Sequence, residues 1–388
     1  MRPIEHDSYV AGIDDEARVE LVRKVLQDRQ AQLVSWREEP MGGGGSGSEL
    51  YMVSGEATTS GTVLSWKFIL KMFNHEGEGW QETSTDPMAW DFWKREWLVY
   101  QAPWIRDLRE GLVAPHCFGS GELGESAVWV AMEDLAAADQ RPWSLSRFAA
   151  AARHLGEFNG RFVVDGDPPA DWWLSRGWLQ GWTERAEPMI TQVPSLVDHP
   201  RVAELYAPST IRLLLQVWEH RRELYEALDA VPQCVCHQDL FPRNAFVRVV
   251  GGAEQTVAID WAFCGWAALG ADLAPLLGAS LGFFEVDSVD ADELERLCLD
   301  AYLDGLRLTD WQGHRDDVFV GYLATIALRF MVGTVGPVLT GALDNSLDAM
   351  IEQIFGLPRP ELIARWRKLH EFFDEPRLAS LLATFGYA

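Results

Sequence analysis

A short segment in the second half of the chain holds the side chains best suited to chemistry. It reads Cys-His-Gln-Asp-Leu-Phe-Pro-Arg-Asn over residues 236–244, and Val-Ala-Ile-Asp-Trp follows at 257–261. Phosphoryl transfer from a nucleotide needs a carboxylate that orients the acceptor hydroxyl and oxygen ligands for Mg²⁺. The spacing therefore predicts kinase chemistry, with Asp239 as the catalytic carboxylate and with Asn244 and Asp260 as the metal ligands.

The residues between these two segments predict a β-hairpin. Apolar, β-branched runs at 245–250 and 256–259 flank Gly251-Gly252 and a short polar link. A glycine turn between two such runs favours antiparallel pairing. The hairpin would return Asp260 to the loop that holds Asp239.

The first part of the chain predicts a small sheet that binds a nucleotide. Its expected elements are an amphipathic helix over residues 13–30 and strands over 31–36, 49–53 and 63–73. Between the first two strands lies a glycine-rich run in which Gly43, Gly44, Gly45 and Ser46 are expected to bring backbone N–H groups to the phosphates. The alternative is a flexible linker, which is what most glycine runs form.

Lys71, on the third of these strands, is the expected phosphate-binding cation. Lys67 has the same side-chain parity, so strand alternation does not separate the two. Lys71 is preferred because Phe-Ile-Leu precedes it and marks a buried strand centre, where a cation is costly without a partner. Glu96, with aromatic neighbours on an expected helix over residues 86–101, is the predicted partner.

A later apolar run, residues 128–135, ends in acidic residues and predicts a change from sheet to helices. Met132, Glu133 and Leu135 are the expected backbone contacts of an adenine ring at this point. Helical patterns then cover residues 145–163, 202–228, 291–306, 317–332, 347–354 and 360–373.

Composition indicates a folded enzyme and excludes several other classes. The chain has 388 residues, 48% of them hydrophobic, which is enough for a large core in two or three lobes. A formal charge of −25 argues against a nucleic-acid partner. It is compatible with a cationic substrate, or with an acidic surface that only maintains solubility.

Targeting and redox signals point to the cytoplasm. Residues 1–23 do not form a signal peptide, and no apolar run is expected to cross a bilayer, so no membrane partner is expected. The five cysteines lack zinc-ligand spacing, which favours buried, reduced thiols. The oligomeric state stays open between monomer and homodimer.

Taken in order, these motifs resemble the aminoglycoside phosphotransferase and choline kinase group, which shares the protein-kinase fold. The family loop His-Gly-Asp-Leu-x-x-x-Asn corresponds to residues 237–244, with Gln238 in place of Gly. Ile259-Asp260-Trp261 and Asp272-Leu273-Ala274, with Gly270 just before the latter, match two further family motifs. The resemblance covers residues 30–340, and the glycine-rich run is its least typical part.

The resemblance implies an α+β, bilobal fold with a small antiparallel-sheet N-lobe and a larger helical C-lobe. The expected boundaries are an N-lobe over residues 1–132, a hinge over 133–137 and a C-lobe over 138–388. It also implies that His237 packs under the loop and that Asp272 braces it, both in structural roles. Arg243 would contact phosphate or form a surface salt bridge, and Gln238 would add a side chain on the hydroxyl-binding side.

The acceptor pocket is expected in the C-lobe, near a tryptophan-rich segment at residues 171–182. Trp173, Trp178, Glu184 and Glu187 are the candidate substrate contacts, since aromatic faces and carboxylates suit sugar rings and cations. The alternative is ordinary packing of these aromatic residues against the core.

We therefore expect a small-molecule kinase that uses Mg²⁺ and ATP or GTP to phosphorylate a hydroxyl of an antibiotic or a sugar-bearing metabolite. An aminoglycoside-type acceptor, as in antibiotic resistance, is narrowly favoured over choline, a plain sugar, a nucleoside antibiotic or a macrolide. A regulatory pseudokinase and a protein kinase are the alternatives. The complete Lys, Glu, Asp, Asn, Asp set argues against the first, and the lack of Asp-Phe-Gly and Ala-Pro-Glu segments argues against the second.

Overall fold

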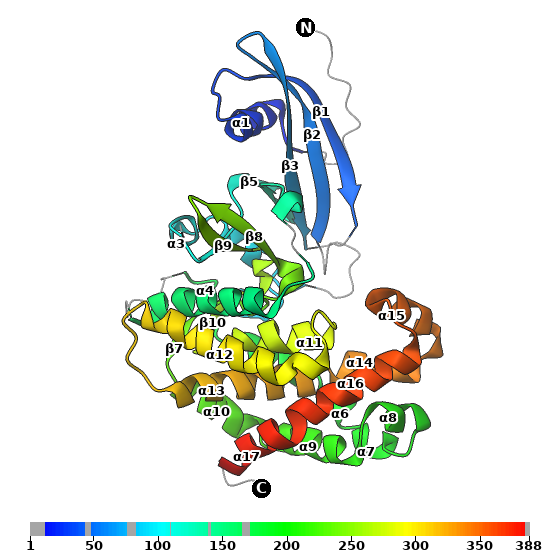
Figure 1. Ribbon diagram of the computed structural model, residues 1–388. Coiled ribbons are helices and arrows are strands. Elements are labelled where there is room, and N and C mark those ends of the chain that lie inside the picture. The colour runs from blue at the N-terminus through cyan, green and yellow to red at the C-terminus, as the bar shows by residue number, and fades with distance from the viewer. Residues whose placement is uncertain are drawn as a thin grey trace.

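A computed structural model describes residues 12–42, 48–75, 83–108, 110–138, 141–164 and 171–384. Figure 1 shows an antiparallel sheet at one end of the molecule and a larger group of helices at the other. The expected α+β architecture, with a sheet-based N-lobe and a helical C-lobe, is confirmed. Gly43, Gly44, Gly45 and Ser46 lie outside the described residues.

The N-lobe is built on a five-stranded antiparallel sheet with the strand order β1-β2-β3-β6-β5. Its strands are β1 (Gln32–Met41), β2 (Ser48–Thr59), β3 (Thr62–Asn74), β5 (Cys117–Leu123) and β6 (Ala127–Met132). The first two are longer than expected, because β1 and β2 pair from Gln32↔Thr58 to Met41↔Leu50. Helix α1 (Asp15–Leu26) packs on this sheet, and Asp14 caps it by accepting a hydrogen bond from the Ala17 N–H at 2.8 Å.

The helix expected over residues 86–101 is much shorter. Only α2 (Arg95–Val99) is helical there, followed by α3 (Pro103–Arg106). The buried Arg95 guanidinium accounts for the difference, because it donates hydrogen bonds to the carbonyl oxygens of Pro87 at 3.2 Å and Trp90 at 2.9 Å, and to that of Ala89. Carbonyl groups turned toward a buried cation are not available for helical hydrogen bonds.

The C-lobe is mainly helical. Its helices are α4 (Leu145–Val164), α5 (Trp178–Glu184), α6 (Glu187–Ile190), α7 (Val193–Leu196), α8 (Pro200–Leu205), α9 (Pro208–Glu219), α10 (Arg221–Ala230), α11 (Ser280–Gly282), α12 (Ala291–Arg307), α13 (Arg315–Thr325), α14 (Val335–Leu343), α15 (Asp348–Phe355), α16 (Arg359–Phe373) and α17 (Ser380–Thr384). The single helix expected over residues 202–228 is wrong. Pro208 keeps Ala207 extended and starts α9, and His220 separates α9 from α10.

Short strands connect the lobes and flank residues 237–244, the segment that holds the predicted catalytic residue Asp239 and is called the catalytic loop below. They are β4 (Leu112–Val113), β7 (Gln233–Cys236), β8 (Ala245–Val250), β9 (Ala253–Ala258) and β10 (Gly265–Ala268). The structure forms the β8–β9 hairpin, paired from Ala245↔Ala258 to Val250↔Ala253. Beneath these strands α4 crosses α12 closely at Gly156 and Gly305, where a Cβ atom would lie 2.1 Å from a backbone oxygen of the other helix.

The apolar stretch Arg315–Leu343 corrects one expectation. It is long and apolar enough to span a membrane by length and composition, whereas we expect no such run from the sequence. Because 72% of its most apolar window is buried inside the protein, it is also what a core helix looks like.

Among the described residues all five cysteines are free, and four of them are buried.

Candidate active site

Asp272 sets the backbone of the catalytic loop. Its fully buried carboxylate accepts the N–H groups of His237 at 3.1 Å and Gln238 at 2.6 Å, and the Asn159 amide at 3.0 Å. Tyr302 on α12 donates in turn to the Asn159 oxygen at 2.8 Å. The close packing of α4 against α12 therefore determines where the loop leaves β7, which is the bracing geometry expected for Asp272.

Gln238 occupies a backbone conformation that favours glycine, the residue that the family loop would have at this position. Its φ is +64°, in the left-handed region that costs a residue with a Cβ atom roughly 1 kcal/mol. The side chain is buried and donates to the Phe263 carbonyl at 3.0 Å. This bond and the hydrogen bond from the Gln238 N–H to Asp272 hold the conformation, and an effect of the side chain on the hydroxyl-binding side stays a prediction.

His237 fixes the direction of the next residue. Its Nε2–H donates to the Ile259 carbonyl at 2.9 Å, and its Nδ1 accepts the Asp239 N–H at 3.1 Å. Burial lowers the pKa of His237 to about 4, so the ring is neutral and can play both roles. The ring also packs on Trp261, with centroids 4.4 Å apart. These contacts tie the loop to the end of the hairpin.

Asp239 is held through both carboxylate oxygens. Asn244 Nδ2 donates to Oδ2 at 2.8 Å, and the guanidinium of Arg329 pairs with Oδ1. Burial raises the pKa of Asp239 to about 6; the Arg329 charge opposes this shift and the Asp260 charge adds to it. At neutral pH the group is therefore an ionised base with a fixed orientation.

Lys71 connects the N-lobe to this loop. Its ammonium lies 2.7 Å from Glu96 Oε2 and 3.1 Å from Asp260 Oδ1. Burial opposes the charged form, but the Asp260 and Glu96 carboxylates outweigh it and raise the pKa of Lys71. The competing Lys67 is exposed and pairs with Asp134 at 2.5 Å. Burial and partners thus separate two lysines that strand alternation could not.

These side chains share one cavity between the lobes. Lys71, Glu96, Asp239 and Asp260 all line it, and Ser48, at the end of the glycine-rich run, closes one side. The four titratable groups come from β3, α2, the catalytic loop and the end of the hairpin. Residues up to 189 positions apart in the sequence therefore lie in contact in this cavity.

The arrangement suits a magnesium–nucleotide complex. Asp260 keeps a side chain 42% exposed toward the cavity, and the Lys71 charge outweighs burial and lowers its pKa. Asn244 uses its amide nitrogen on Asp239, which leaves its amide oxygen for a cation. Among the described residues no group of three His, Cys, Asp or Glu could hold a metal alone. Mg²⁺ bound to nucleotide phosphates commonly takes only one or two protein oxygens, so the residues fit.

The expected adenine contacts lie beside this cavity and do not line it. The Glu133 N–H donates to the His116 carbonyl at 3.0 Å, and its carboxylate binds Arg248 at 2.7 Å. Met132 ends β6, and Leu135 packs in a small apolar cluster with Ile259. Glu133 therefore ties the linking segment to the hairpin, and its N–H is already used.

The four candidate substrate residues also lie away from the cavity walls. Trp173 is buried against Trp104, with ring centroids 6.5 Å apart, and Trp178 is buried between Trp182 and Phe263. Glu184 accepts Arg221 at 3.2 Å. Glu187 is exposed at the start of α6. The two tryptophans are packed as the alternative describes, and a substrate role for the four residues stays a prediction. Arg243 likewise forms an ion pair, with Glu285 at 2.7 Å.

Arg329 is the site residue that the sequence reading missed. It lies on the π-helical turn η6 (Ile326–Val332), is only 5% exposed, and binds both Asp239 and the Gln238 carbonyl. The rings of Trp178 and Phe330 lie 4.8 and 4.9 Å from its guanidinium. A single arginine within the apolar run Ala-Thr-Ile-Ala-Leu-Arg-Phe-Met-Val was the available signal, because a buried cation is costly without a partner.

Comparison with known proteins identifies the class of this enzyme. A model of the phosphotransferase enzyme family (APH) matches residues 93–315, more than half of the chain. The chain therefore belongs to this family, and it is a small-molecule phosphotransferase that acts on hydroxyl groups. No curated protein sequence matches it.

Several solved structures are similar to this chain at low sequence identity. The amicoumacin kinase hAmiN, in complex with AMP-PNP, Ca²⁺ and Ami, is 15% identical over 92% of this chain and 95% of that chain, with a TM-score of 0.48. The aminoglycoside phosphotransferase APH(3'')-Id from Streptomyces rimosus is 17% identical over 81% and 98%, with a TM-score of 0.41. A microcompartment-associated aminopropanol kinase is 13% identical over 88% and 94%, with a TM-score of 0.45.

Proposed function

We propose that this enzyme transfers the γ-phosphate of ATP to a hydroxyl of a small organic molecule, with Mg²⁺ as cofactor. The observation that carries the proposal is the meeting of Lys71, Glu96, Asp239 and Asp260 around one cavity. Lys71 would bind the nucleotide phosphates while Glu96 holds its ammonium in place. Asn244 and Asp260 would hold the metal, which neutralises charge on the phosphates when bound.

Asp239 would orient the acceptor and receive its proton. Arg329 and Asn244 restrict rotation of the carboxylate, so its remaining lone pairs keep one direction. Fixing the position of the acceptor hydroxyl contributes more to phosphoryl transfer than a strong base does. The reason is that the bond to the attacking oxygen is only slightly formed in the transition state. His237 and Asp272 would act only by fixing the backbone of the loop.

The acceptor we propose is an antibiotic or another hydroxyl-bearing metabolite. The aminoglycoside-type acceptor that the sequence narrowly favoured loses support from Glu184, because that carboxylate is already paired with Arg221.

We propose that the N-lobe ends at residue 132, that residues 133–137 link the lobes, and that a monomer or homodimer acts in the cytoplasm. The free thiols support that location.

The test is nucleotide consumption by the purified protein with a panel of hydroxyl compounds, ATP or GTP, and Mg²⁺. We expect acceptor-dependent turnover, and we expect Asp239→Asn to lower kcat on the order of 10³-fold while circular dichroism stays unchanged. Asp229→Asn, on the exposed end of α10, is the matched control. Nucleotide binding without turnover on any acceptor, or near-normal transfer by Asp239→Asn, would contradict the proposal.

A further inference from the structure

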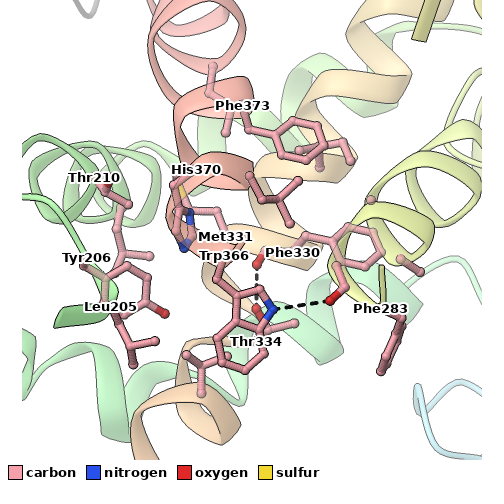
Figure 2. A pocket seen from close by; sticks show the side chains of 18 of the residues that line it. Leu205, Tyr206, Thr210, Phe283, Phe330, Met331, Thr334, Trp366, His370 and Phe373 are labelled. Atoms are coloured by element: carbon pink, nitrogen blue, oxygen red, sulfur yellow. Dashed lines mark hydrogen bonds between the residues drawn. The ribbon is translucent and has the colours of Figure 1, made fainter. Parts of the chain in front are cut away.

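A second cavity lies in the C-lobe, on another face of the helix that carries Arg329. Its volume is about 220 Å³. Figure 2 shows Phe330 and Met331 from η6, Trp366 and His370 from α16, and Tyr206 around a common space. This volume exceeds the ~150 Å³ cavity that admits benzene, so it has room for a substituted or fused ring.

The walls are suited to an uncharged body. Among the described residues that line the cavity, none is Asp, Glu, Lys or Arg. The Trp366 Nε1–H already donates to the Gly282 carbonyl at 3.3 Å, and the Thr334 hydroxyl donates to the Phe330 carbonyl at 2.5 Å, as the dashed lines in Figure 2 mark. Burial lowers the pKa of His370 to about 4, so its ring is neutral. An ammonium group would lose its hydration here without gaining a carboxylate partner.

The cavity adjoins the catalytic loop along two aromatic contacts. The Phe330 ring lines it, and the Arg329 guanidinium that pairs with Asp239 lies 4.9 Å from the centre of that ring. Phe283 also lines it and stacks on Phe241 of the catalytic loop, with centroids 5.7 Å apart. The Arg329 guanidinium group therefore contacts both the Phe330 ring on the cavity wall and the Asp239 carboxylate.

We propose that this cavity binds the apolar body of the acceptor, an uncharged aromatic or alicyclic group, while a hydroxyl-bearing arm extends past Arg329 to Asp239. This inference rests on the proposed function and narrows its acceptor class. His370 provides a polar atom with which a carbonyl or hydroxyl on that body can bond, since its ring makes no hydrogen bond to any residue in the described part of the chain. A polycationic sugar is the acceptor that this cavity excludes.

Gly282 offers a way to fill the cavity without disturbing its walls. It lines the space, and the nearest atom to an added Cβ would be Leu369 Cδ2 at 4.0 Å. Its contact with Trp366 uses the backbone carbonyl, which a side chain leaves intact. Gly282→Leu should therefore fold and occupy the space. Gly177→Leu is the matched control, because a Cβ there meets nothing within 4 Å and the residue lies outside the cavity.

The experiment combines binding and transfer. N-Phenyl-1-naphthylamine, an uncharged fluorescent probe, should bind the wild-type protein and the Gly177→Leu control, and Gly282→Leu should weaken it roughly tenfold or more. In transfer assays, the acceptors are alcohols that carry phenyl or naphthyl groups of increasing apolar size. The kcat/KM of the wild type should rise about fourfold for each added apolar area equal to one buried methylene. Gly282→Leu should remove that rise and leave KM for the nucleotide unchanged.

Two failures are distinguishable. If the wild type phosphorylates acceptors but Gly282→Leu keeps the same preference for apolar ones, the cavity has no part in acceptor binding and this inference is wrong. Transfer only to polycationic sugars would overturn it as well. If no acceptor supports Asp239-dependent transfer, the proposed function fails, and the acceptor role of the cavity fails with it whatever the probe does.

Discussion

Replacing Arg329 with glutamine tests how the site controls Asp239. The arginine and aspartate side chains are only 6% and 18% exposed, and burial already raises the pKa of Asp239 to about 6. Removal of the neighbouring positive charge must raise this pKa further, because ionisation of the carboxylate loses its cation. The proposed role of Asp239 requires the ionised form, so activity should be lost at a higher pH in the variant than in the wild type.

The size of the shift follows from Coulomb's law. Two unit charges about 4 Å apart at an effective dielectric of about 20 interact by about 4 kcal/mol, which is about three pKa units. Glutamine can keep one hydrogen bond, and water would enter beside it. We therefore expect the acidic limb of kcat/KM to move upward by about one to two pH units.

The assay is the pH dependence of kcat/KM for the acceptor at saturating magnesium nucleotide, for wild type and variant alike. Arg185→Gln is the control, since its guanidinium also lies on an aromatic ring, 3.4 Å from the centre of Trp182, and binds the Gly333 carbonyl and not Asp239. An acidic limb that stays in place or moves to lower pH in Arg329→Gln would refute the reasoning. So would an equal shift in Arg185→Gln.

Three further predictions follow from the same site. Lys71→Met should lower kcat/KM for the nucleotide about 10²-fold and lower the melting temperature, since Glu96 is left buried without a cation. Adding Glu96→Gln should restore the melting temperature and not the activity. An unchanged nucleotide KM in Lys71→Met would contradict the role of Lys71. Asp272→Asn should lower the free energy of unfolding in urea by about 2–3 kcal/mol, because an amide group presents a donor to backbone N–H groups that need an acceptor; wild-type stability would show that the brace is dispensable. Chelation with EDTA should abolish transfer until Mg²⁺ is added, and Asp260→Asn should raise the Mg²⁺ concentration for half-maximal activity by more than about tenfold, whereas an unchanged Mg²⁺ requirement would remove Asp260 from the metal site.

Features decided by local sequence were predictable. The loop around Asp239 and the β8–β9 hairpin are close in sequence, so a glycine turn and strand alternation were enough to bring Asp260 back beside Asn244. The helices α4, α12 and α16 also begin and end within a few residues of their expected bounds. The family match confirms the resemblance that these motifs carried.

Features decided by distant partners were not predictable. Residues 86–94 were expected to be helical, yet Arg95 is buried against the distant Ala262 carbonyl at 3.0 Å and also donates to the Pro87 and Trp90 carbonyl groups, so these make no helical hydrogen bonds. The tryptophans at 173 and 178 look like ligand contacts in sequence, but one packs in the core and the other against Arg329. A pattern of residue types does not say which face of an element meets the core, because that depends on what packs against it.

The sequence by itself determined the reaction class, since Asp239, Asn244 and Asp260 lie in short segments whose local geometry brings them together. Only the tertiary structure decided how that chemistry is controlled. Arg329 reaches Asp239 across 90 residues, and the same helix presents Phe330 to the apolar cavity on another face. Such contacts come from the packing of the C-lobe helices, which keeps water away from the Arg329–Asp239 ion pair and leaves the cavity walls without Asp, Glu, Lys or Arg among the described residues.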